Sequence, residues 1–573
     1  MAVIRKIEIA NFRCLKKFVW QPSPGINCLI GPGDSGKSSI LDAIDYCLGA
    51  RRNLLIADTD FHLLDVNSPI RITVTIGKLD DALKSIDAYG LYLKGFDAES
   101  GDIVEEPEAG LETVLTVELT VAGDLEPQWK LVSERAAAQG HSRNLNWADR
   151  QRIAPTRLGI FSENHLSWRR GSILNRISEE RVDASAALVA AAREMRNEFG
   201  EQAKDQLAAA LQIVTETAND LGVPVGEEVK ALLDAHSVSI NGGTISLHDD
   251  RGVPLKALGL GSARLLIAGL QRQGSQNTAM AIVDELEHGL EPHRIIRLID
   301  ALGAKEQDPP LQAFITTHSP AAVRELMGNQ LYVVRQVGDQ HFAKIVGTAN
   351  DIQGTIRLFP EALLAPSIIV CEGASEVGFL RGLDQHRIST GETALTALGV
   401  GLVDGGGNNT FRRANAFLML GYRTAVLRDS DAAITPLLER TFRNSGGAVF
   451  AWTPGRALED ELFLSLSDDA VEKLIDEAIN LKDESFIDEN IKSASGNAKD
   501  LAAIRAELTT SGITDESSEI LSTAAKSASG WYKTVTAMET VAREIIGPAL
   551  GDATDEFIKK VEALFDWMQD DQG

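Results

Sequence analysis

The chain has little cysteine, few aromatic residues and no long apolar run. Its four cysteines (Cys14, Cys28, Cys47 and Cys371) show no paired spacing among 573 residues. That pattern excludes a disulfide scaffold and gives no zinc signature, and it indicates buried thiols in a reducing compartment. No apolar run approaches the ~20 residues of a membrane helix, and the first residues have a strand pattern in place of a charged and then apolar leader. We therefore expect an intracellular protein without a membrane partner.

Positive charge is also scarce. The chain has 56 Lys and Arg against 82 Asp and Glu, a formal net charge of −26 at pH 7, which opposes nucleic-acid binding by the chain as a whole. The distribution is uneven, because residues 363–456 have nine Arg and eight acids, whereas residues 457–573 have ten Lys or Arg and 26 acids. The acidic tail fits an ordinary solvated helical surface, or a face that repels DNA or meets a basic partner.

A glycine-rich segment, residues 31–38, fits the pattern G-x-x-x-x-G-K-[ST]. It follows an apolar run and precedes a helical pattern, which is the strand–loop–helix context that the motif needs. A glycine-rich turn that happens to contain Lys is the alternative, and the flanking elements disfavour it. The backbone N–H groups of such a loop wrap phosphates at a helix N-terminus. Lys37 would contact the β- and γ-phosphates of ATP, and Ser38 would ligate Mg²⁺. The residues expected to bind nucleotide in this segment are Gly31, Gly33, Ser35, Gly36, Lys37, Ser38 and Ser39.

Three further motifs follow between residues 258 and 320. Residues 281–285 indicate a strand ending in Asp284, which would hold Mg²⁺ through water, and Glu285, which would polarise the attacking water. A second strand pattern ends in His318, which is placed as a γ-phosphate sensor; a structural capping histidine is the alternative. Upstream, residues 258–264 contain Gly261 and Ser262 in a variant of the ABC signature.

This order of motifs resembles that of the ABC-type ATPases. In that family the signature segment contacts the γ-phosphate of a nucleotide held by another subunit. The resemblance therefore implies a dimer, in which Ser262 and Arg264 act on ATP bound by the P-loop of another copy. An opening strand that delivers a Phe-Arg pair ending in Arg13 is similar to the ABC ATPases of DNA maintenance and defence, and we place Arg13 among the nucleotide-binding residues. An ordinary edge strand ending in Arg is the alternative.

Two apolar strand patterns in the C-terminal part end in carboxylates. Residues 367–371 lead into Glu372, and residues 424–428 lead into Asp429 and Asp431. Parallel strands of one sheet would bring these ends together, where Mg²⁺ or Mn²⁺ would find oxygen ligands. Glu376 lies one helical turn beyond Glu372 and can face the same site. A cation bound there would activate water and stabilise a leaving oxygen.

These carboxylates resemble the metal ligands of the Toprim catalytic domain. An ABC ATPase joined to a Toprim domain resembles the OLD (overcoming lysogenization defect) nucleases, which include the nuclease subunit of Gabija phage-defence systems, and the resemblance covers nearly the whole chain. It implies a late acid that completes a two-metal site, with Glu459 and Asp460 as candidates, and a late catalytic lysine at Lys533. An acid-rich helix N-terminus is the alternative for the two acids, and a surface lysine for Lys533.

The expected fold class is α/β, with an ABC-type ATPase that carries a helical insertion, followed by a Toprim-like α/β domain with a helical, acidic tail. A hydrophobic content of 44% over this length suits two to four domains with separate cores. An apolar stripe in the insertion, at Leu188, Ala191, Ala192, Met195 and Phe199, fits either an intramolecular core or a dimer seam, and the family favours the seam. The expected layout is 1–165 for the first ATPase lobe, 166–235 for the insertion, 236–350 for the second lobe, 351–366 for a linker and 367–573 for the Toprim-like domain.

Three functions compete. The favoured one is an ATP-hydrolysing, Mg²⁺- or Mn²⁺-dependent DNA endonuclease of anti-phage defence, in the cytoplasm of a bacterium or archaeon, acting as a homodimer or larger assembly with a UvrD-type helicase as one candidate partner. The second is a DNA-binding ABC ATPase clamp or sensor of DNA repair with a scaffold Toprim domain, and the complete set of Glu372, Asp429 and Asp431 argues against it. The third is a topoisomerase or primase. None of the six Tyr residues lies in a motif for the nucleophile that a topoisomerase needs, and a primase would normally lack the ABC half.

Overall fold

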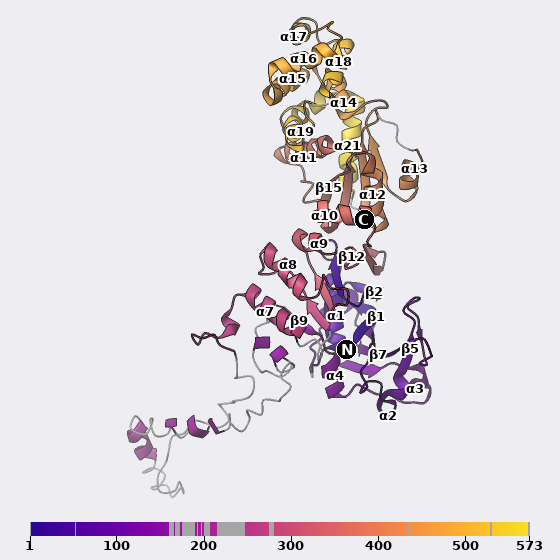
Figure 1. Cartoon of the computed structure of the whole chain (residues 1–573), viewed down its shortest axis with the longest axis vertical. Coiled ribbons are helices and arrows are strands. Elements are labelled where there is room, and N and C mark those ends of the chain that lie inside the picture. Colours follow the sequence, from indigo (N-terminus) through magenta and orange to yellow (C-terminus); the bar gives the residue numbers. More distant parts are fainter. Residues whose placement is uncertain are drawn as a thin grey trace. The chain divides into compact units, whose positions relative to one another are not determined.

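A computed structural model describes residues 2–51, 53–159, 247–273, 280–431, 436–527 and 530–570, with short pieces between residues 165 and 214 (Figure 1). Most of the predicted insertion, residues 166–235, lies outside the described residues, so its role in dimerisation stays a prediction. The chain divides into two compact units. Residues 1–29, 36–317 and 336–342 form the first, and residues 30–35, 318–335 and 343–573 form the second.

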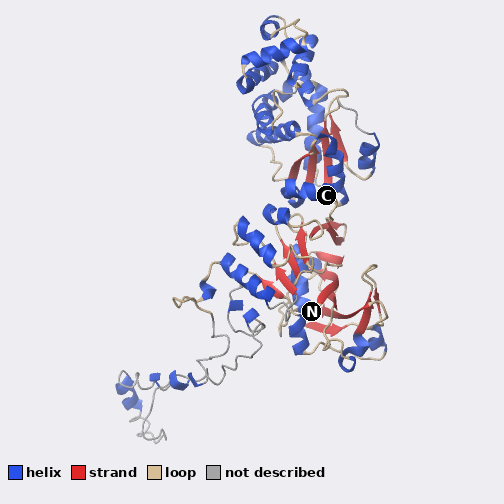
Figure 2. Ribbon diagram, in the orientation of Figure 1, coloured by secondary structure: helices blue, strands red, loops and turns tan. Residues whose placement is uncertain are grey.

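The larger of the two sheets has 13 strands and is mixed (Figure 2). Its strands are β1 (Val3–Phe12), β2 (Leu15–Trp20), β3 (Ile26–Ile30), β4 (Ile70–Gly77), β5 (Leu93–Phe96), β6 (Ile103–Val104), β7 (Glu112–Val121), β8 (Pro127–Leu131), β9 (Thr156–Leu158), β10 (Met280–Val283), β11 (Gln312–Thr316), β12 (Leu331–Val337) and β13 (Gln340–Ile345). The strand order is β6-β5-β7-β4-β1-β2-β13-β12-β3-β11-β10-β9, and β8 pairs with β7.

The two halves of this sheet differ in direction and in burial. Strands β1, β2, β4 and β7 pair antiparallel, and in β4 the apolar residues alternate, with Ile70, Ile72 and Val74 buried. Strands β3, β11, β10 and β9 pair parallel. In β3, β10 and β11 every residue is buried, as expected for parallel strands that are covered on both faces.

Helices join these strands and place the motifs at strand ends. Helix α1 packs on β4, β7, β1 and β11, and α7 packs on α8 and β9. The helices with residues up to 325 are α1 (Lys37–Leu48), α2 (Ile86–Tyr89), α3 (Glu134–Ala138), α4 (Trp147–Ile153), α7 (Leu260–Gln273), α8 (Pro292–Ala301) and α9 (Pro320–Glu325), with short 3₁₀ turns at η1 (Asp58–Asp60), η2 (His62–Leu64), η3 (Gly90–Tyr92) and η6 (Leu255–Ala257).

The smaller sheet has four parallel strands in the order β15-β14-β16-β17. Their bounds are β14 (Ser367–Cys371), β15 (Val400–Asp404), β16 (Arg423–Arg428) and β17 (Ala448–Ala451). The helices around it are α10 (Asn350–Leu358), α11 (Ala374–Ser389), α12 (Thr410–Met419) and α13 (Pro436–Asn444), with η7 (Pro360–Leu364) and η8 (Gly407–Asn409). The predicted α/β class is confirmed, although a parallel sheet of this kind does not by itself identify a Toprim domain.

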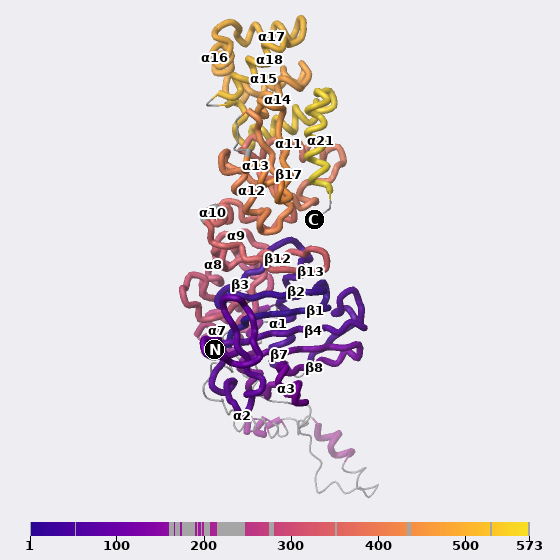
Figure 3. The backbone as a smooth tube through the Cα atoms, turned by 90° about the vertical axis from the view of Figure 1, so that its right-hand side faces the viewer, coloured from indigo at the N-terminus to yellow at the C-terminus, as the bar shows by residue number. Residues whose placement is uncertain are grey.

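The acidic tail is helical, as the sequence predicts, and its helices pack on one another (Figure 3). They are α14 (Leu458–Ser465), α15 (Asp468–Lys482), α16 (Glu484–Ala494), α17 (Leu501–Thr510), α18 (Asp515–Ala525), α19 (Val535–Val541), the π-helical η9 (Ala542–Ile546), α20 (Gly547–Ala549), η10 (Leu550–Asp552) and α21 (Asp555–Gln569). Among the described residues, none of the helices has the length and apolar content needed to cross a membrane.

The segment predicted as a linker, residues 351–366, is mostly helix. It belongs to α10 and η7, and its Ile356 and Leu363 are buried. The hydroxyl of Tyr422 donates a hydrogen bond to the carbonyl oxygen of Leu363 at 2.6 Å. The segment is therefore part of the packed structure, because its apolar side chains are buried.

Two glycines let α11 approach the tail closely. A Cβ atom on Gly378 would lie 2.5 Å from the carbonyl oxygen of Val535, and one on Gly382 would lie 2.2 Å from that of Glu539. Real Cβ atoms do not approach backbone oxygens so closely, so any side chain here would push α11 and α19 apart.

We expect Gly382→Ala to lower the free energy of unfolding by about 1–3 kcal/mol, because the added methyl group overpacks this contact. Gly354→Ala is the matched control, since Gly354 lies inside α10 and a Cβ there would have nothing within 4 Å. The control should be stabilising by about 0.5–1 kcal/mol through helix propensity. Urea denaturation followed by circular dichroism measures both, and equal stability of the two variants would show that α11 and α19 are not packed this closely.

Candidate functional site

The P-loop joins the end of β3 to the start of α1, as the motif predicts. Gly31 and Gly36 have φ angles of 134° and 86°, in the left-handed region that favours glycine. A Cβ atom on Gly36 would lie 2.9 Å from both the Cys14 Sγ and the Leu15 Cδ2. The loop thus has the backbone that directs N–H groups toward an anion at the N-terminus of a helix.

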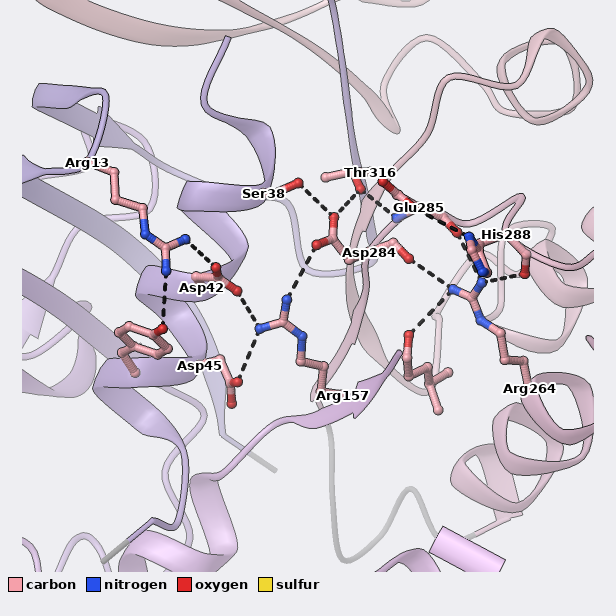
Figure 4. Close-up of polar contacts among 12 residues, drawn as sticks. Arg13, Ser38, Asp42, Asp45, Arg157, Arg264, Asp284, Glu285, His288 and Thr316 are labelled. Carbon is pink, nitrogen blue, oxygen red and sulfur yellow. Dashed lines mark hydrogen bonds and ion pairs between the residues drawn. The ribbon is translucent and has the colours of Figure 1, made fainter. Parts of the chain in front are cut away.

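Ser38 and Asp284 meet although they are 246 residues apart (Figure 4). The Ser38 hydroxyl donates to Asp284 Oδ1 at 3.0 Å, and the Thr316 hydroxyl donates to the same oxygen at 2.6 Å. Because the Ser38 hydroxyl donates a hydrogen bond to the carboxylate, the lone pairs of its oxygen stay available to a cation. The pair therefore fits the hydroxyl ligand and the water-mediated carboxylate of a Mg²⁺ site beside a P-loop.

Glu285 follows directly in an uncommon backbone conformation. Its φ angle is 47°, which is rare for a residue other than glycine, and its N–H donates to Thr316 Oγ1 at 2.8 Å. The carboxylate is 62% exposed and lies 3.5 Å from His288 Nδ1. An exposed acid beside the candidate Mg²⁺ site is placed to accept a proton from water.

The other predicted nucleotide-site residues lie near the same strand ends. His318 is exposed just after β11, and Lys37 is buried at the start of α1. Ser35 donates to the carbonyl oxygen of Pro32 at 2.9 Å. The remaining members are Gly33 in the loop, Ser39 in the first turn of α1, and Gly261 and Ser262 in the first turn of α7.

The prediction that Arg264 reaches a nucleotide on another copy is wrong. Arg264 is 1% exposed. Its guanidinium donates to the carbonyl oxygens of Glu285 and His288 at 3.0 and 2.8 Å, and to that of Asp284 at 3.0 Å. Arg264 therefore shapes the turn after β10 from inside its own chain. Ser262, two residues before Arg264, accepts a hydrogen bond from Arg294 at 3.1 Å.

Two arginines tie the acids of α1 to their surroundings. Arg13, predicted to bind nucleotide, donates to Asp60 Oδ1 at 2.9 Å and pairs with Asp42. Arg157, which lies in no motif of the sequence, pairs with Asp42 at 2.5 Å and with Asp284 at 3.3 Å. The sequence pattern that could have identified Arg157 is weak, because β9 has three residues and contains no motif.

A second cluster forms at the carboxyl ends of β14 and β16, which are neighbours in the smaller sheet. The backbone N–H of Asp429 donates to Glu372 Oε2 at 2.9 Å. Asp429 Oδ1 in turn accepts the N–H of Leu458 at 2.9 Å, which ties the start of α14 to the same place. The structure thus brings together two of the predicted metal ligands and the helix that carries the late acids.

Two carboxylates of this cluster, Glu376 and Glu459, are buried, Glu372 and Asp429 are partly buried, and the group repels itself electrostatically. Burial raises the pKa of Asp429 to about 9, with repulsion from Glu376, Glu459 and Glu372 adding to it. Burial likewise raises the pKa of Glu376 to about 7, and again Glu459 and Glu372 contribute. Burial raises the pKa of Glu372 as well, and the nearby Asp431 adds to this shift.

The structure distinguishes the two late acids. Asp460 accepts the N–H of Ala457 at 2.8 Å and pairs with Lys526 at 2.7 Å, so it caps α14. Glu459 is the one that raises the pKa of Glu376. Lys533, the predicted catalytic lysine, favours the charged form of Glu459 and so lowers its pKa, although burial dominates and raises it. Lys533 therefore lies beside this cluster, and Lys526 is a neighbour that the sequence did not reveal.

These acids fit a divalent cation in their chemistry, since hard cations bind carboxylate oxygens. Among the described residues, no three His, Cys, Asp or Glu side chains are grouped closely enough to hold a metal ion as they stand. The carboxylates would therefore have to close on a cation as it neutralises their repulsion.

Comparison with known proteins bears on the N-terminal part. A family model described as an AAA domain, putative AbiEii toxin, type IV TA system, matches residues 26–324. A DNA replication and repair protein RecF of Chlorobium phaeovibrioides is 30% identical over 111 residues, 18% of this chain and 30% of that protein. The chromosome partition protein Smc of Methanocaldococcus jannaschii is 43% identical over 49 residues, 9% of this chain and 4% of that protein.

The chain thus spans less than a third of the length of these curated relatives. Among solved structures, an Smc head domain from Pyrococcus furiosus with an extended coiled coil, bound to the C-terminal domain of ScpA, aligns with a TM-score of 0.34 and 14% identity. This alignment covers 60% of this chain and 96% of that chain.

We expect the metal-free protein to lose stability as the pH rises from about 4 to 9. Between the ordinary carboxyl pKa values near 4 and the raised values of about 7 for Glu376 and about 9 for Asp429, the folded chain binds more protons than the unfolded chain, so the free energy of unfolding is highest at low pH and falls across this window. Thermal melts in EDTA measure the effect. Asp429→Asn should flatten the profile, whereas Glu392→Gln, on an exposed ion pair, should not. Parallel profiles for all three proteins would contradict the mutual repulsion.

We expect Glu285→Gln to retain ATP binding and to slow ATP hydrolysis by ~10²–10⁴-fold, because an amide cannot accept the proton of the attacking water. Steady-state phosphate release and binding of a fluorescent nucleotide separate the two effects. Glu291→Gln is the control, since Glu291 is an acid near the same turn that pairs with Arg294. Unchanged turnover in Glu285→Gln would transfer the role of base to another group, with Glu287 as the next candidate.

Proposed function

The chain belongs to the AAA-domain family, and from this premise we propose that it is an ATP-hydrolysing, divalent-metal-dependent DNA endonuclease. The observation that carries the nuclease assignment is the junction of Glu372 with Asp429 at the ends of adjacent parallel strands. Buried Glu376 and Glu459 add to the same cluster. Mg²⁺ or Mn²⁺ bound there would activate a water and stabilise the leaving oxygen of a phosphodiester.

The chain's own residues have distinct tasks in this proposal. Glu372, Asp429 and Glu459 bind the cation, with Glu376 and the exposed Asp431 completing its surroundings. Each of the first three comes from a different element, so the site exists only when β14, β16 and α14 are packed together. Asp460 is not given a metal-binding role, because its carboxylate is used by the cap of α14 and by Lys526.

Lys533 supplies positive charge next to these acids. Its ammonium group donates to the carbonyl oxygens of Lys526 and Ser527 at 3.0 and 3.2 Å, which orients it without a counter-ion in those contacts. A lysine held in this way can stabilise the negative charge that develops on a phosphate during cleavage.

The ATPase part acts through the P-loop. Gly31 to Lys37 would hold the phosphates, Ser38 and Asp284 would share the Mg²⁺, and Glu285 would take the proton of the attacking water. His318 would sense the γ-phosphate from the end of β11. Gly261 and Ser262 would meet the nucleotide of a second copy, so we include a homodimer in the proposal. The remaining parts, which rest on the resemblance to OLD nucleases, are the role in anti-phage defence and a helicase partner of the UvrD type.

A second candidate is a DNA-associated ATPase of repair in which the carboxylate cluster does not cleave. The similarity to a protein named for DNA replication and repair favours it. It differs from the first candidate in one measurable respect, since it would bind DNA in an ATP-dependent manner and leave it intact in Mg²⁺ or Mn²⁺.

We expect Asp429→Ala and Glu372→Ala each to abolish cleavage of plasmid DNA in Mg²⁺ or Mn²⁺ and to leave ATP hydrolysis close to that of the unmodified chain. The reason is that the two sites are built by different sheets. Agarose gels of plasmid incubated with each variant measure cleavage, and phosphate release measures the ATPase.

Glu392→Gln controls for loss of an acid elsewhere in the same unit and should cut normally. Cleavage by Asp429→Ala at the normal rate would remove the nuclease assignment from this cluster. Intact plasmid with the unmodified chain, together with ATP-dependent DNA binding, would favour the second candidate.

A further inference from the structure

Arg157 occupies a central place beside the nucleotide site that no motif assigns to it. It lies in β9, opposite Ile282 of the neighbouring β10. Figure 4 shows its guanidinium between the acids of α1 and the carboxylate of Asp284. The Arg157 Nη1 contacts Asp42 Oδ1 at 2.5 Å and Asp45 Oδ2 at 3.3 Å. The Arg157 Nη2 contacts Asp284 Oδ2 at 3.3 Å.

The acids that contact the two ends of the Arg157 guanidinium differ in their other partners. Asp42 also pairs with Arg13, and Asp45 also pairs with Arg51. The acids of α1 would therefore keep a cationic partner if Arg157 were removed. For Asp284 the structure gives Arg157 as the ion-pair partner, while the other carboxylate oxygen accepts hydroxyl groups from Ser38 and Thr316.

A divalent cation beside Ser38 and Asp284 would share that carboxylate with the guanidinium. The charge on Asp284 that attracts the cation is partly used by Arg157, and the positive charge of Arg157 also repels the cation directly. The pair is only partly exposed, with 29% of the Arg157 side chain and 23% of the Asp284 side chain accessible. Solvent therefore screens this competition less than it would on an open surface.

We propose that Arg157 is a positioning residue that holds Asp284 as an internal counter-cation and thereby weakens, and so sets, the affinity of the nucleotide site for a divalent cation. This inference rests on the ATP-binding part of the proposed function and is independent of the nuclease part. A purely structural tie between β9 and α1 would instead affect stability and leave cation affinity unchanged.

The test is titration of Mn²⁺, followed by electron paramagnetic resonance, into protein that carries a non-hydrolysable ATP analogue. Asp429→Ala is the background throughout, so that Mn²⁺ at the carboxylate cluster is minimised. Arg157→Gln should bind Mn²⁺ about tenfold more tightly, because a unit positive charge at ion-pair distance is removed. Arg157→Lys retains the charge and should bind Mn²⁺ like the background protein.

The chain offers a matched control. Arg51→Gln removes the second partner of Asp45. It should leave Mn²⁺ affinity unchanged. Thermal melts compare the folding of all variants. Should Arg157→Gln not fold, Arg157→Met removes the same positive charge while keeping an unbranched side chain, and it gives the same comparison.

Unchanged or weaker Mn²⁺ binding in Arg157→Gln, with the analogue bound as well as in the background protein, would overturn the proposal. Binding of a fluorescent ATP analogue in EDTA is measured separately. A background protein that binds no analogue with or without Mn²⁺ would count against the ATP site itself, which distinguishes that failure from a failure of the role given to Arg157.

Discussion

Both candidate sites depend on one geometric constraint, which is that the carboxyl ends of neighbouring parallel strands meet at the same edge of a sheet. In the larger sheet this constraint brings Asp284, after β10, next to Thr316, at the end of β11. In the smaller sheet it brings Asp429 next to Glu372. A residue at a strand end is held by the sheet yet faces the loops, so a polar side chain there is positioned without being enclosed by the core.

The two junctions handle negative charge differently. At the nucleotide site, acids are matched by arginines, since Asp42, Asp45 and Asp284 all contact Arg157. In the carboxylate cluster, burial and mutual repulsion raise the pKa of Asp429 and Glu376. Cation binding stabilises a cluster of this kind more than it stabilises acids that are already paired with arginines. The reason is that binding removes repulsion between acids that are already desolvated.

The arginines show why residue type alone is a poor guide to role. Arg264 lies in the signature segment and looks like a nucleotide contact, yet its guanidinium is buried on carbonyl oxygens of its own chain. Arg157 lies in a short strand without a motif, yet it contacts the Asp284 carboxylate, which belongs to a motif. The difference arises because five donors in a fixed fork can satisfy either backbone carbonyls or carboxylates, and packing decides which of them are within reach.

Local patterns in the sequence were sufficient for the P-loop, for strands ending at Asp284, Glu372 and Asp429, and for the α/β class with a helical tail. These features depend on short-range rules, such as buried runs, glycines with positive φ and strand–loop–helix order. Only the tertiary structure decided that Ser38 and Thr316 share Asp284, that Asp460 caps α14 and pairs with Lys526, and that most of the segment 351–366 is packed helix. Those outcomes depend on partners far apart in the chain, and a local pattern gives no information about which distant side chain will fill the space beside it.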